Sequence, residues 1–469
     1  MAGGNGKRRS QDEPGGLPEV GDAAKVGGWL RPDSEQRPGL RSSALLRRPQ
    51  FDIKASPLIP SGLPVVTFPG LFNALPATTP AMTTTAPRRA DLDWLRVLAF
   101  ALLILYHSGM AWSGWTWHLN APEDLPWLRE AMRFVNRWRM PLIFLVSGAA
   151  VALALGHKSE GAFIIDRLRR LALPLAFGML VLVPPQVYAE RAASGQFHGS
   201  FLAWLPHAFD GGAYPNGNLS WHHLWFVAYV LVLTFVLLPY FLWARTPKGS
   251  ARQQVSAEAM ARFHLHWLLA LPLAASLLWL APVSRNPNGL IGDWHGLVYY
   301  GLLLLYGAFI YGTPATLAVL NRQRWLAFAV GVASYATLYL VFFQGTVRPT
   351  IAAADRPLFA LLSGVNTMAW LFAIVGFANR HLVQRPPLLA WATEAVYPFY
   401  MLHQTVTVIA VYWLLQLYIP PAAGFILAAW ATFLGTWLIY VGVVRRVGIL
   451  RPLFGLKGAG HSGTSVASA

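Results

Sequence analysis

The chain has 469 residues, of which 55% are hydrophobic and 12% are charged, and its formal net charge is +17. In a soluble protein this basic balance would indicate nucleic-acid binding. Here, however, most Lys and Arg residues lie in short connections between long apolar runs, where they orient a membrane protein. Nucleic acid is therefore excluded as a partner. The absence of Cys excludes disulfides, a thiol nucleophile and thiolate metal ligands.

The N-terminal part of the chain differs from the rest. Residues 1–88 are rich in Gly, Pro, Arg and Ser and sustain no apolar period, which predicts a disordered extension rather than a secretory signal. Met82 begins a short basic leader directly before the first apolar run, so Met82 is an alternative start of the protein. We expect residues 89–446 to form a transmembrane domain and residues 447–469 a cytoplasmic tail.

Long apolar runs dominate the sequence after residue 90. A helix needs about 20 such residues to cross a membrane, and about ten runs qualify, which predicts an all-α polytopic membrane protein. The expected spans are residues 92–113, 138–156, 171–188, 222–243, 264–282, 296–313, 325–343, 357–378, 388–416 and 422–444. The second contains Ser147 and Gly148, small residues that allow close helix contact in lipid, so we expect it inside the bundle.

The connections between these spans predict the orientation of the protein. Lys and Arg are concentrated in alternate connections, such as residues 158–170 and 245–262, whereas the other connections mix Arg with Asp and Glu. Cytoplasmic connections of membrane proteins carry the excess of Lys and Arg. Both termini are therefore expected in the cytoplasm, which requires an even number of spans.

The first span, "DWLRVLAFALLILYHSG", contains two ionisable residues. Arg96 and His107 are eleven residues apart, which in a helix places them on one face with about 16 Å between them. Arginine suits phosphate groups, and histidine can take a proton from a hydroxyl near neutral pH. From this helix alone, a boundary anchor for Arg96 and a hydrogen-bonded packing role for His107 are the favoured explanations.

Further stretches agree with a known family. The chain resembles the acyltransferase 3 family of membrane acyltransferases, and within it the glucan biosynthesis protein C branch, across residues 90–446. The first-span signature of that family, Arg followed by ten residues and His, matches Arg96 and His107. Other matching stretches are "RMPLIFLVSG" with Arg139, Ser147 and Gly148, "FIIDRLRRLALPL" with Arg167, Arg170 and Pro174, "HHLWFVAYVL" with His223, Trp225 and Phe226, and "EAVYPFYMLHQTV" with His403 and Gln404.

The resemblance implies an enzyme of the inner (plasma) membrane. It would move an acyl group of the acetyl or succinyl class from cytoplasmic acyl-CoA, a co-substrate, to a hydroxyl of an extracytoplasmic carbohydrate such as a glucan or envelope polysaccharide. No cofactor and no metal are expected. His107 would be the general base, and the substrate-binding residues would be Arg96, Arg139, Arg167, Arg169, Arg170, His223, Trp225, Glu394 and His403.

Simpler explanations and other classes of protein remain open. The arginines could only set topology, His223 and Trp225 could anchor a span at the interface, and Glu394 with His403 could be a structural pair. A polytopic transporter of a small anionic or glycan substrate is the main alternative, although no inverted repeat of broken helices is visible. An intramembrane metalloprotease is disfavoured because no His-Glu-x-x-His motif occurs.

Overall fold

The computed structural model describes residues 89–156, 158–347 and 349–458. Within these residues the backbone forms helices and one isolated β-bridge, with no β-strand. The expectation of an all-α protein is therefore confirmed for this part of the chain. The expected disordered extension, residues 1–88, and the alternative start at Met82 lie outside the described residues, as does the end of the expected tail.

The helices follow one another with short connections. The α-helices of the described residues are α1 (Ala90–Met110), α2 (Pro126–Asn136), α3 (Arg139–Gly156), α4 (Glu160–Arg167), α5 (Leu173–Phe177), α6 (Pro184–Ala193), α7 (Phe201–Trp204), α8 (Trp225–Val236), α9 (Leu238–Ala244), α10 (Pro247–Arg262), α11 (Ala270–Ala275), α12 (Trp294–Gly312), α13 (Pro314–Leu338), α14 (Arg356–His381), α15 (Pro387–Leu414), α16 (Pro421–Ile439) and α17 (Leu450–Leu453). Two π-helical segments, Leu168–Ala172 and Gly178–Leu182, join α4, α5 and α6 into one helical run.

Eight helical segments in the described part of the chain are long and apolar enough to cross a membrane. α8 and α9 are bent by 57° at their junction and add a ninth span when the pair is counted as one. α15 coincides with the remaining expected span but is not among these segments, and its middle carries the polar side chains of His403, Gln404 and Thr405. A multi-pass membrane protein is confirmed, whereas the number of qualifying spans is eight or nine instead of ten.

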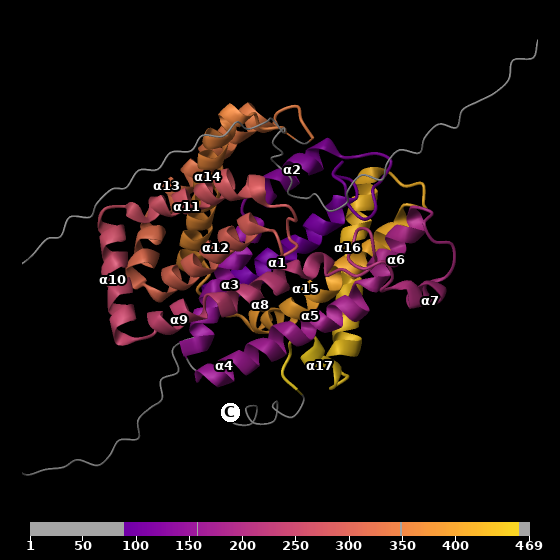
Figure 1. Cartoon of the computed structure of the whole chain (residues 1–469), viewed down its shortest axis with the longest axis horizontal. Coiled ribbons are helices and arrows are strands. Elements are labelled where there is room, and N and C mark those ends of the chain that lie inside the picture. Colours follow the sequence, from indigo (N-terminus) through magenta and orange to yellow (C-terminus); the bar gives the residue numbers. More distant parts are fainter. Residues whose placement is uncertain (1–88, 157, 348, 459–469) are drawn as a thin grey trace, which may run out of the picture. The chain divides into compact units, whose positions relative to one another are not determined.

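The first span lies in the middle of the bundle. α1 packs against α15, α16, α3 and α14, and α15 in turn contacts α6. Figure 1 shows α1 crossing the centre of the molecule, with α13 and α14 beside each other at one end of the bundle and α16 near the other. Helices that are distant in sequence therefore meet around α1, and polar residues on α1, α6 and α15 share one region.

The close contact between α3 and α12 depends on glycine. α3 packs against α12 so tightly that a Cβ on Gly148 would overlap the carbonyl oxygen of Leu304. Reciprocally, a Cβ on Gly307 of α12 would overlap the carbonyl oxygen of Leu145. Small residues are what allow two helix backbones to approach this closely in lipid. The expectation that the Ser147–Gly148 pair lies inside the bundle is confirmed for Gly148.

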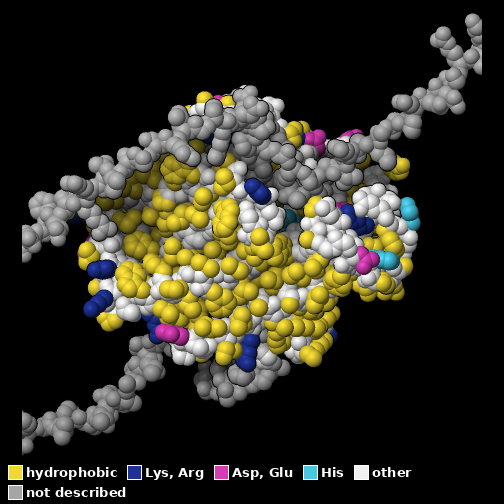
Figure 2. All heavy atoms as spheres, viewed as in Figure 1, with side chains coloured by type: hydrophobic (Ala, Val, Ile, Leu, Met, Phe, Trp, Pro, Cys, Tyr) yellow, Lys and Arg dark blue, Asp and Glu magenta, His cyan; other side chains and the backbone are white. Residues whose placement is uncertain are grey.

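The outside of the bundle is apolar. Large hydrophobic side chains are exposed on many helices, among them Leu180, Trp279, Trp325 and Trp430. Figure 2 shows hydrophobic side chains covering the middle of one face, with Lys and Arg side chains mostly near its margins. Continuous exposed apolar surface of this extent indicates contact with a membrane, because soluble monomers rarely expose large apolar patches.

Candidate functional site

Two histidines from distant parts of the sequence form the centre of the site. His107 lies near the end of α1 and His403 in the middle of α15, and the packing of these helices brings His107 Nδ1 within 2.8 Å of His403 Nε2. The His403 side chain is buried at 1% exposure, whereas His107 is half-buried. The structure thus joins His107 to a residue that sequence motifs placed in a separate span.

The hydrogen bonds around His403 decide which nitrogen of His107 is protonated. His403 Nδ1 lies 2.6 Å from the Tyr400 carbonyl oxygen, which can only accept, so His403 Nδ1 carries the hydrogen. In the neutral ring His403 Nε2 is then an acceptor, and His107 Nδ1 must donate to it. His107 Nε2 is left with a lone pair. This is the arrangement that a histidine base requires, because its other nitrogen is fixed by a hydrogen bond.

His223 completes an inner set of three histidines. Its ring centroid lies 5.3 Å from that of His403, and its Nε2 donates to the Met401 carbonyl oxygen at 3.0 Å. Tyr400 donates back to the His223 carbonyl oxygen at 2.6 Å, so the start of α8 is tied to α15 in both directions. His223 Nδ1 is buried and has no hydrogen-bond partner among the described residues. It therefore presents an unused acceptor next to the His107–His403 pair.

Arg139 supplies a buried positive charge beside these histidines. It is the first residue of α3, is 6% exposed and lies over the Tyr106 ring at 3.5 Å from the centroid. Within the described chain it forms no ion pair, and its Nε and Nη1 have no hydrogen-bond partner. Its charge acts on His107 and His403. A buried cation without a carboxylate suits a negative charge carried by a ligand or developed in a reaction.

The basic residues expected at the cytoplasmic mouth share one carboxylate. Asp166 accepts from Lys158 at 2.8 Å, from Arg167 at 3.0 Å and from Arg170 at 2.8 Å. Arg169 is exposed and has no ion pair within the described residues. The segment therefore keeps a net positive charge after Asp166 is counted. Sequence reasoning included these arginines but overlooked the carboxylate between them.

Arg96 lies on the same helix as His107, nearer its N-terminal end, and is half-buried. The start of α1 also carries two buried carboxylates that sequence reasoning did not use. Asp91 pairs with Arg89 at 2.8 Å, and Asp93 pairs with Arg385 at 2.8 Å. The Asp93–Arg385 pair, together with a hydrogen bond that Asn379 donates to Asp91 at 3.3 Å, holds the first turn of α1 against other segments, and with it the position of Arg96.

Two of the expected site residues lie elsewhere. Glu394 is on α15, but its carboxylate is 3.7 Å from Arg451 and its side chain is 40% exposed. It is nine residues before His403, which corresponds to about 13 Å along a helix, so the two side chains do not form a pair. Trp225 packs in an aromatic group with Phe144 and Tyr300. The structure gathers His107, His223, His403 and Arg139 and leaves Glu394 and Trp225 outside that group.

A second polar group adjoins the histidines, and of its members only His222 and Gln404 lie in the stretches that match the family. Its members are His118, Gln186, Glu190, Tyr214, His222 and Gln404, which we call the outer cluster. His118 Nδ1 donates to Glu190 Oε2 at 2.7 Å, and Gln404 Nε2 donates to His118 Nε2 at 3.1 Å. Gln186 and Gln404 are amides within stretches that the sequence predicts as membrane spans, and that was the signal available in the sequence.

Tyr214 joins the outer cluster through hydrogen bonds to Glu190. Its hydroxyl donates to both carboxylate oxygens of Glu190, at 2.9 and 3.1 Å. Burial, together with the adjacent Glu190 carboxylate, raises the pKa of Tyr214, so the phenol remains a donor.

The described residues contain no group of three or more His, Asp or Glu side chains placed to hold a metal ion.

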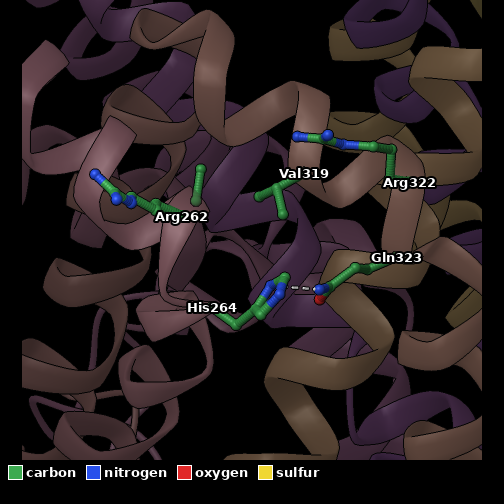
Figure 3. A pocket seen from close by; sticks show the side chains of 6 residues that line it. Arg262, His264, Val319, Arg322 and Gln323 are labelled. Atoms are coloured by element: carbon green, nitrogen blue, oxygen red, sulfur yellow. Dashed lines mark hydrogen bonds between the residues drawn. The ribbon is translucent and has the colours of Figure 1, made fainter.

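A separate open cavity of about 350 Å³ lies between the end of α10 and α13. It is lined by Ala261, Arg262, His264, Val319, Arg322 and Gln323. Figure 3 shows Gln323 directed at His264, to which it donates at 2.6 Å, and Arg262 pointing away from the other labelled side chains. The two arginines do not converge on one point, and none of the histidines of the inner set lines this cavity.

Comparisons with known proteins point to one family. Residues 89–441 match a family model described as an acyltransferase domain, Acyl_transf_3. Proteins named glucans biosynthesis protein C from Salmonella paratyphi A, Salmonella agona and Salmonella schwarzengrund are each 26% identical to this chain over 196 residues. The matched segment is 40% of this chain and 49% of each relative, so the chain spans about half the length of the curated relatives that it matches.

Proposed function

Because the chain belongs to the acyltransferase 3 family, we propose that it transfers an acyl group from cytoplasmic acyl-CoA to a hydroxyl of a carbohydrate on the other side of the membrane. The observation that carries this proposal is the His107–His403 hydrogen bond, which leaves His107 Nε2 free to take a proton. The carbohydrate class is supported by the name of the relatives, glucans biosynthesis protein C. A plasma-membrane location follows from a donor in the cytoplasm and an acceptor outside it.

The proposed reaction uses His107 first as a base and then as an acid. His107 Nε2 takes the proton of the acceptor hydroxyl while that oxygen attacks the thioester carbonyl carbon. A C–O bond forms, the C–S bond breaks, and the proton passes from His107 to the leaving sulfur, giving an ester and free CoA. Throughout, His107 Nδ1 keeps its hydrogen bond to His403, which is therefore a positioning residue.

Arg139 is the proposed stabiliser of the oxyanion. The tetrahedral intermediate carries a negative charge on the former carbonyl oxygen, and donors are needed where that charge develops. Arg139 Nε and Nη1 have no partner among the described residues, and both are buried. Their charge acts on the same region as His107 and His403. In a site from which water is excluded, such donors have a large effect on the rate.

The phosphates of acyl-CoA are assigned to the basic segment around Arg169, together with Arg96. Arg167 and Arg170 both form ion pairs with Asp166, whereas Arg169 is exposed and has no ion pair within the described part of the chain. Arg96 and His107 are separated by about 16 Å along α1, a distance that the pantetheine arm of CoA can span. We therefore expect the phosphates near Arg96 and the thioester near His107.

The reaction is tested with purified protein, labelled acetyl-CoA or succinyl-CoA, and a glucan extract. We expect loss of the thioester that depends on the acceptor, together with label in the glucan fraction. Uptake of label into liposomes without thioester loss would instead support a transporter.

His107→Asn is the variant that separates a base from a packing residue. Asparagine keeps a hydrogen-bond donor that can replace Nδ1 but cannot take a proton near neutral pH. We expect the variant to bind acyl-CoA normally while kcat falls about a hundredfold or more, which is the usual size of a general-base contribution. Full acyl transfer by a folded His107→Asn protein would exclude His107 as the base.

A further inference from the structure

The outer cluster adjoins the proposed catalytic centre along two elements. Gln404 directly follows His403 on α15, and His222 directly precedes His223 at the start of α8. His118 follows the C-terminal end of α1, the end opposite to Arg96. The cluster therefore lies beyond His107 when the path is followed from the proposed donor end of α1.

The hydrogen bonds of Gln186 determine the state of His222. Gln186 Nε2 donates to the Leu182 carbonyl oxygen at 3.1 Å and to Thr405 Oγ1 at 2.8 Å, which fixes the orientation of the amide. Gln186 Oε1 is consequently an acceptor, and His222 Nδ1, at 3.2 Å, must donate to it. His222 Nε2 then holds a lone pair, and this atom is buried without a partner among the described residues.

Two neighbouring histidines thus present buried acceptors that nothing in the described chain satisfies, namely His222 Nε2 and His223 Nδ1. Buried polar atoms in proteins normally have a hydrogen-bond partner, so these two acceptors on consecutive residues are available for hydrogen bonds from a ligand. His222 also has a backbone φ of 39°, in the left-handed region, which few non-glycine residues occupy.

The chemistry of the cluster selects a neutral ligand rich in hydroxyl groups. The neighbouring Arg191 is positive, but its nitrogens already donate to oxygens of Asn218, Gln196 and Pro215. The groups left to contact a ligand are the Glu190 carboxylate and the lone pairs of the two histidine atoms, which would repel a phosphate or carboxylate. Hydroxyl groups can donate to the histidines and also accept from an amide such as that of Gln404. The rings of His118 and Trp117, with centroids 5.2 Å apart, add flat apolar faces next to these groups.

We propose that the outer cluster binds the sugar ring of the acceptor, with His222 Nε2 and His223 Nδ1 accepting hydrogen bonds from its hydroxyl groups. This inference rests on the proposed function for the identity of the ligand as an acceptor. The binding of a neutral sugar at this place can nevertheless be measured without any acyl transfer.

The test uses His222→Asn and Glu190→Gln in the full chain. Asparagine keeps the donor to Gln186 and removes the Nε2 acceptor, and glutamine keeps the shape of Glu190 and removes its charge. We expect each variant to weaken binding of a neutral glucose oligosaccharide, measured by calorimetry without acyl-CoA, by about tenfold or more. The KM for acyl-CoA should stay unchanged, while the KM for the glucan acceptor rises by a similar factor.

His207→Asn is the matched control. His207 lies in the same connection between α6 and α8, but it is exposed and pairs only with Asp210. It should bind the oligosaccharide as the unmodified protein does. A glucuronic acid oligosaccharide is the second control, and it should bind poorly because of Glu190.

The two proposals fail in different ways. If the unmodified protein binds the neutral oligosaccharide through His222 and Glu190 but never cleaves acyl-CoA, the sugar site stands and the acyl transfer is wrong. If acyl transfer occurs while folded His222→Asn and Glu190→Gln proteins bind and use the acceptor normally, the assignment of the outer cluster is overturned. Binding of the charged oligosaccharide as tightly as the neutral one would also overturn it.

Discussion

At the scale of single residues, the state of His107 depends on His403. The Tyr400 carbonyl oxygen fixes the hydrogen on His403 Nδ1, and this in turn fixes the hydrogen on His107 Nδ1. A second residue that sets the tautomer of a functional histidine typically changes activity by about 10 to 100-fold when it is replaced. The effect of His403 on activity, through the tautomer of His107, can therefore be measured separately from its contribution to packing.

We predict that His403→Leu lowers kcat by about a hundredfold, whereas His403→Gln retains activity within about tenfold of the unmodified protein. Glutamine places an acceptor oxygen near the position of Nε2, and leucine has none. The measurement is kcat at saturating acyl-CoA, with the KM for acyl-CoA as the control. An equal loss in both folded variants would show that His403 matters only for packing.

We expect the buried charge of Arg139 to lower the stability of the protein and to raise its activity. Taking a guanidinium out of water costs several kcal/mol, whereas a desolvated cation–π contact such as that with Tyr106 contributes about 2 kcal/mol. The cost of desolvating the guanidinium is larger than the contribution of the cation–π contact. The unliganded protein therefore holds Arg139 at a net cost in stability, which is expected of a residue kept for its function.

We predict that Arg139→Met raises the thermal unfolding midpoint and lowers acyl transfer by about a hundredfold or more. Arg133→Met is the control, because Arg133 is buried but donates to Glu130 at 2.9 Å and to the Thr346 carbonyl oxygen at 2.7 Å. Its loss should lower the midpoint. A lowered midpoint together with retained transfer in Arg139→Met would make Arg139 a structural residue.

At the scale of helices, the α3–α12 contact limits what the site can tolerate. α3 carries Arg139 at its start, and the position of that side chain depends on how closely α3 approaches α12 at Gly148 and Gly307. Backbone atoms cannot move aside as a flexible side chain can. A methyl group at either glycine must therefore separate the helices.

We predict that Gly148→Ala destabilises the protein by about 1 to 3 kcal/mol, the usual cost of overpacking. Gly156→Ala on the same helix is the control, since a Cβ there meets nothing within 4 Å. Alanine also favours helix over glycine, so Gly156→Ala should be neutral or slightly stabilising. Thermal unfolding in detergent compares the two. Equal midpoints for both variants would mean that α3 and α12 are less tightly packed than described.

At the scale of the whole molecule, the orientation in the membrane decides which substrate reaches which end of α1. The segment that includes Arg245, Lys248 and Arg252 is strongly basic, and such segments remain in the cytoplasm. The outer cluster must then open to the opposite side. Both statements depend on the same assignment of sides, so one labelling experiment tests them together.

We predict that Ser250→Cys is labelled by a membrane-impermeant thiol reagent only after cells are opened, whereas Ser194→Cys is labelled in intact cells. Both serines are exposed, on α10 and directly after α6. The chain has no native Cys, so labelling has no background from the protein itself. Labelling of Ser250→Cys in intact cells would show that the orientation is inverted.

The sequence alone was enough to find the membrane spans, because the transfer of a helix into lipid depends on the apolar residues of that one segment. It also predicted the shared face of Arg96 and His107, which follows from helix geometry, and it placed Gly148 at a helix contact. The sequence also predicted a span at α15, but α15 is not among the helices that are apolar enough to cross a membrane, because its middle is polar. Each of these predictions depends only on residues that are close together in the sequence.

Only the tertiary structure decided which polar residues meet. His107 and His403 are 296 residues apart, and Gln404 and His118 are 286 apart. Sequence spacing instead suggested Glu394 as the partner of His403, and the structure pairs Glu394 with Arg451. The reason is physical: hydropathy and helix periodicity are sums over adjacent residues, whereas the contacts of α15 with α1 and α6 depend on the packing of the whole bundle. The outer cluster exists only as a result of that packing.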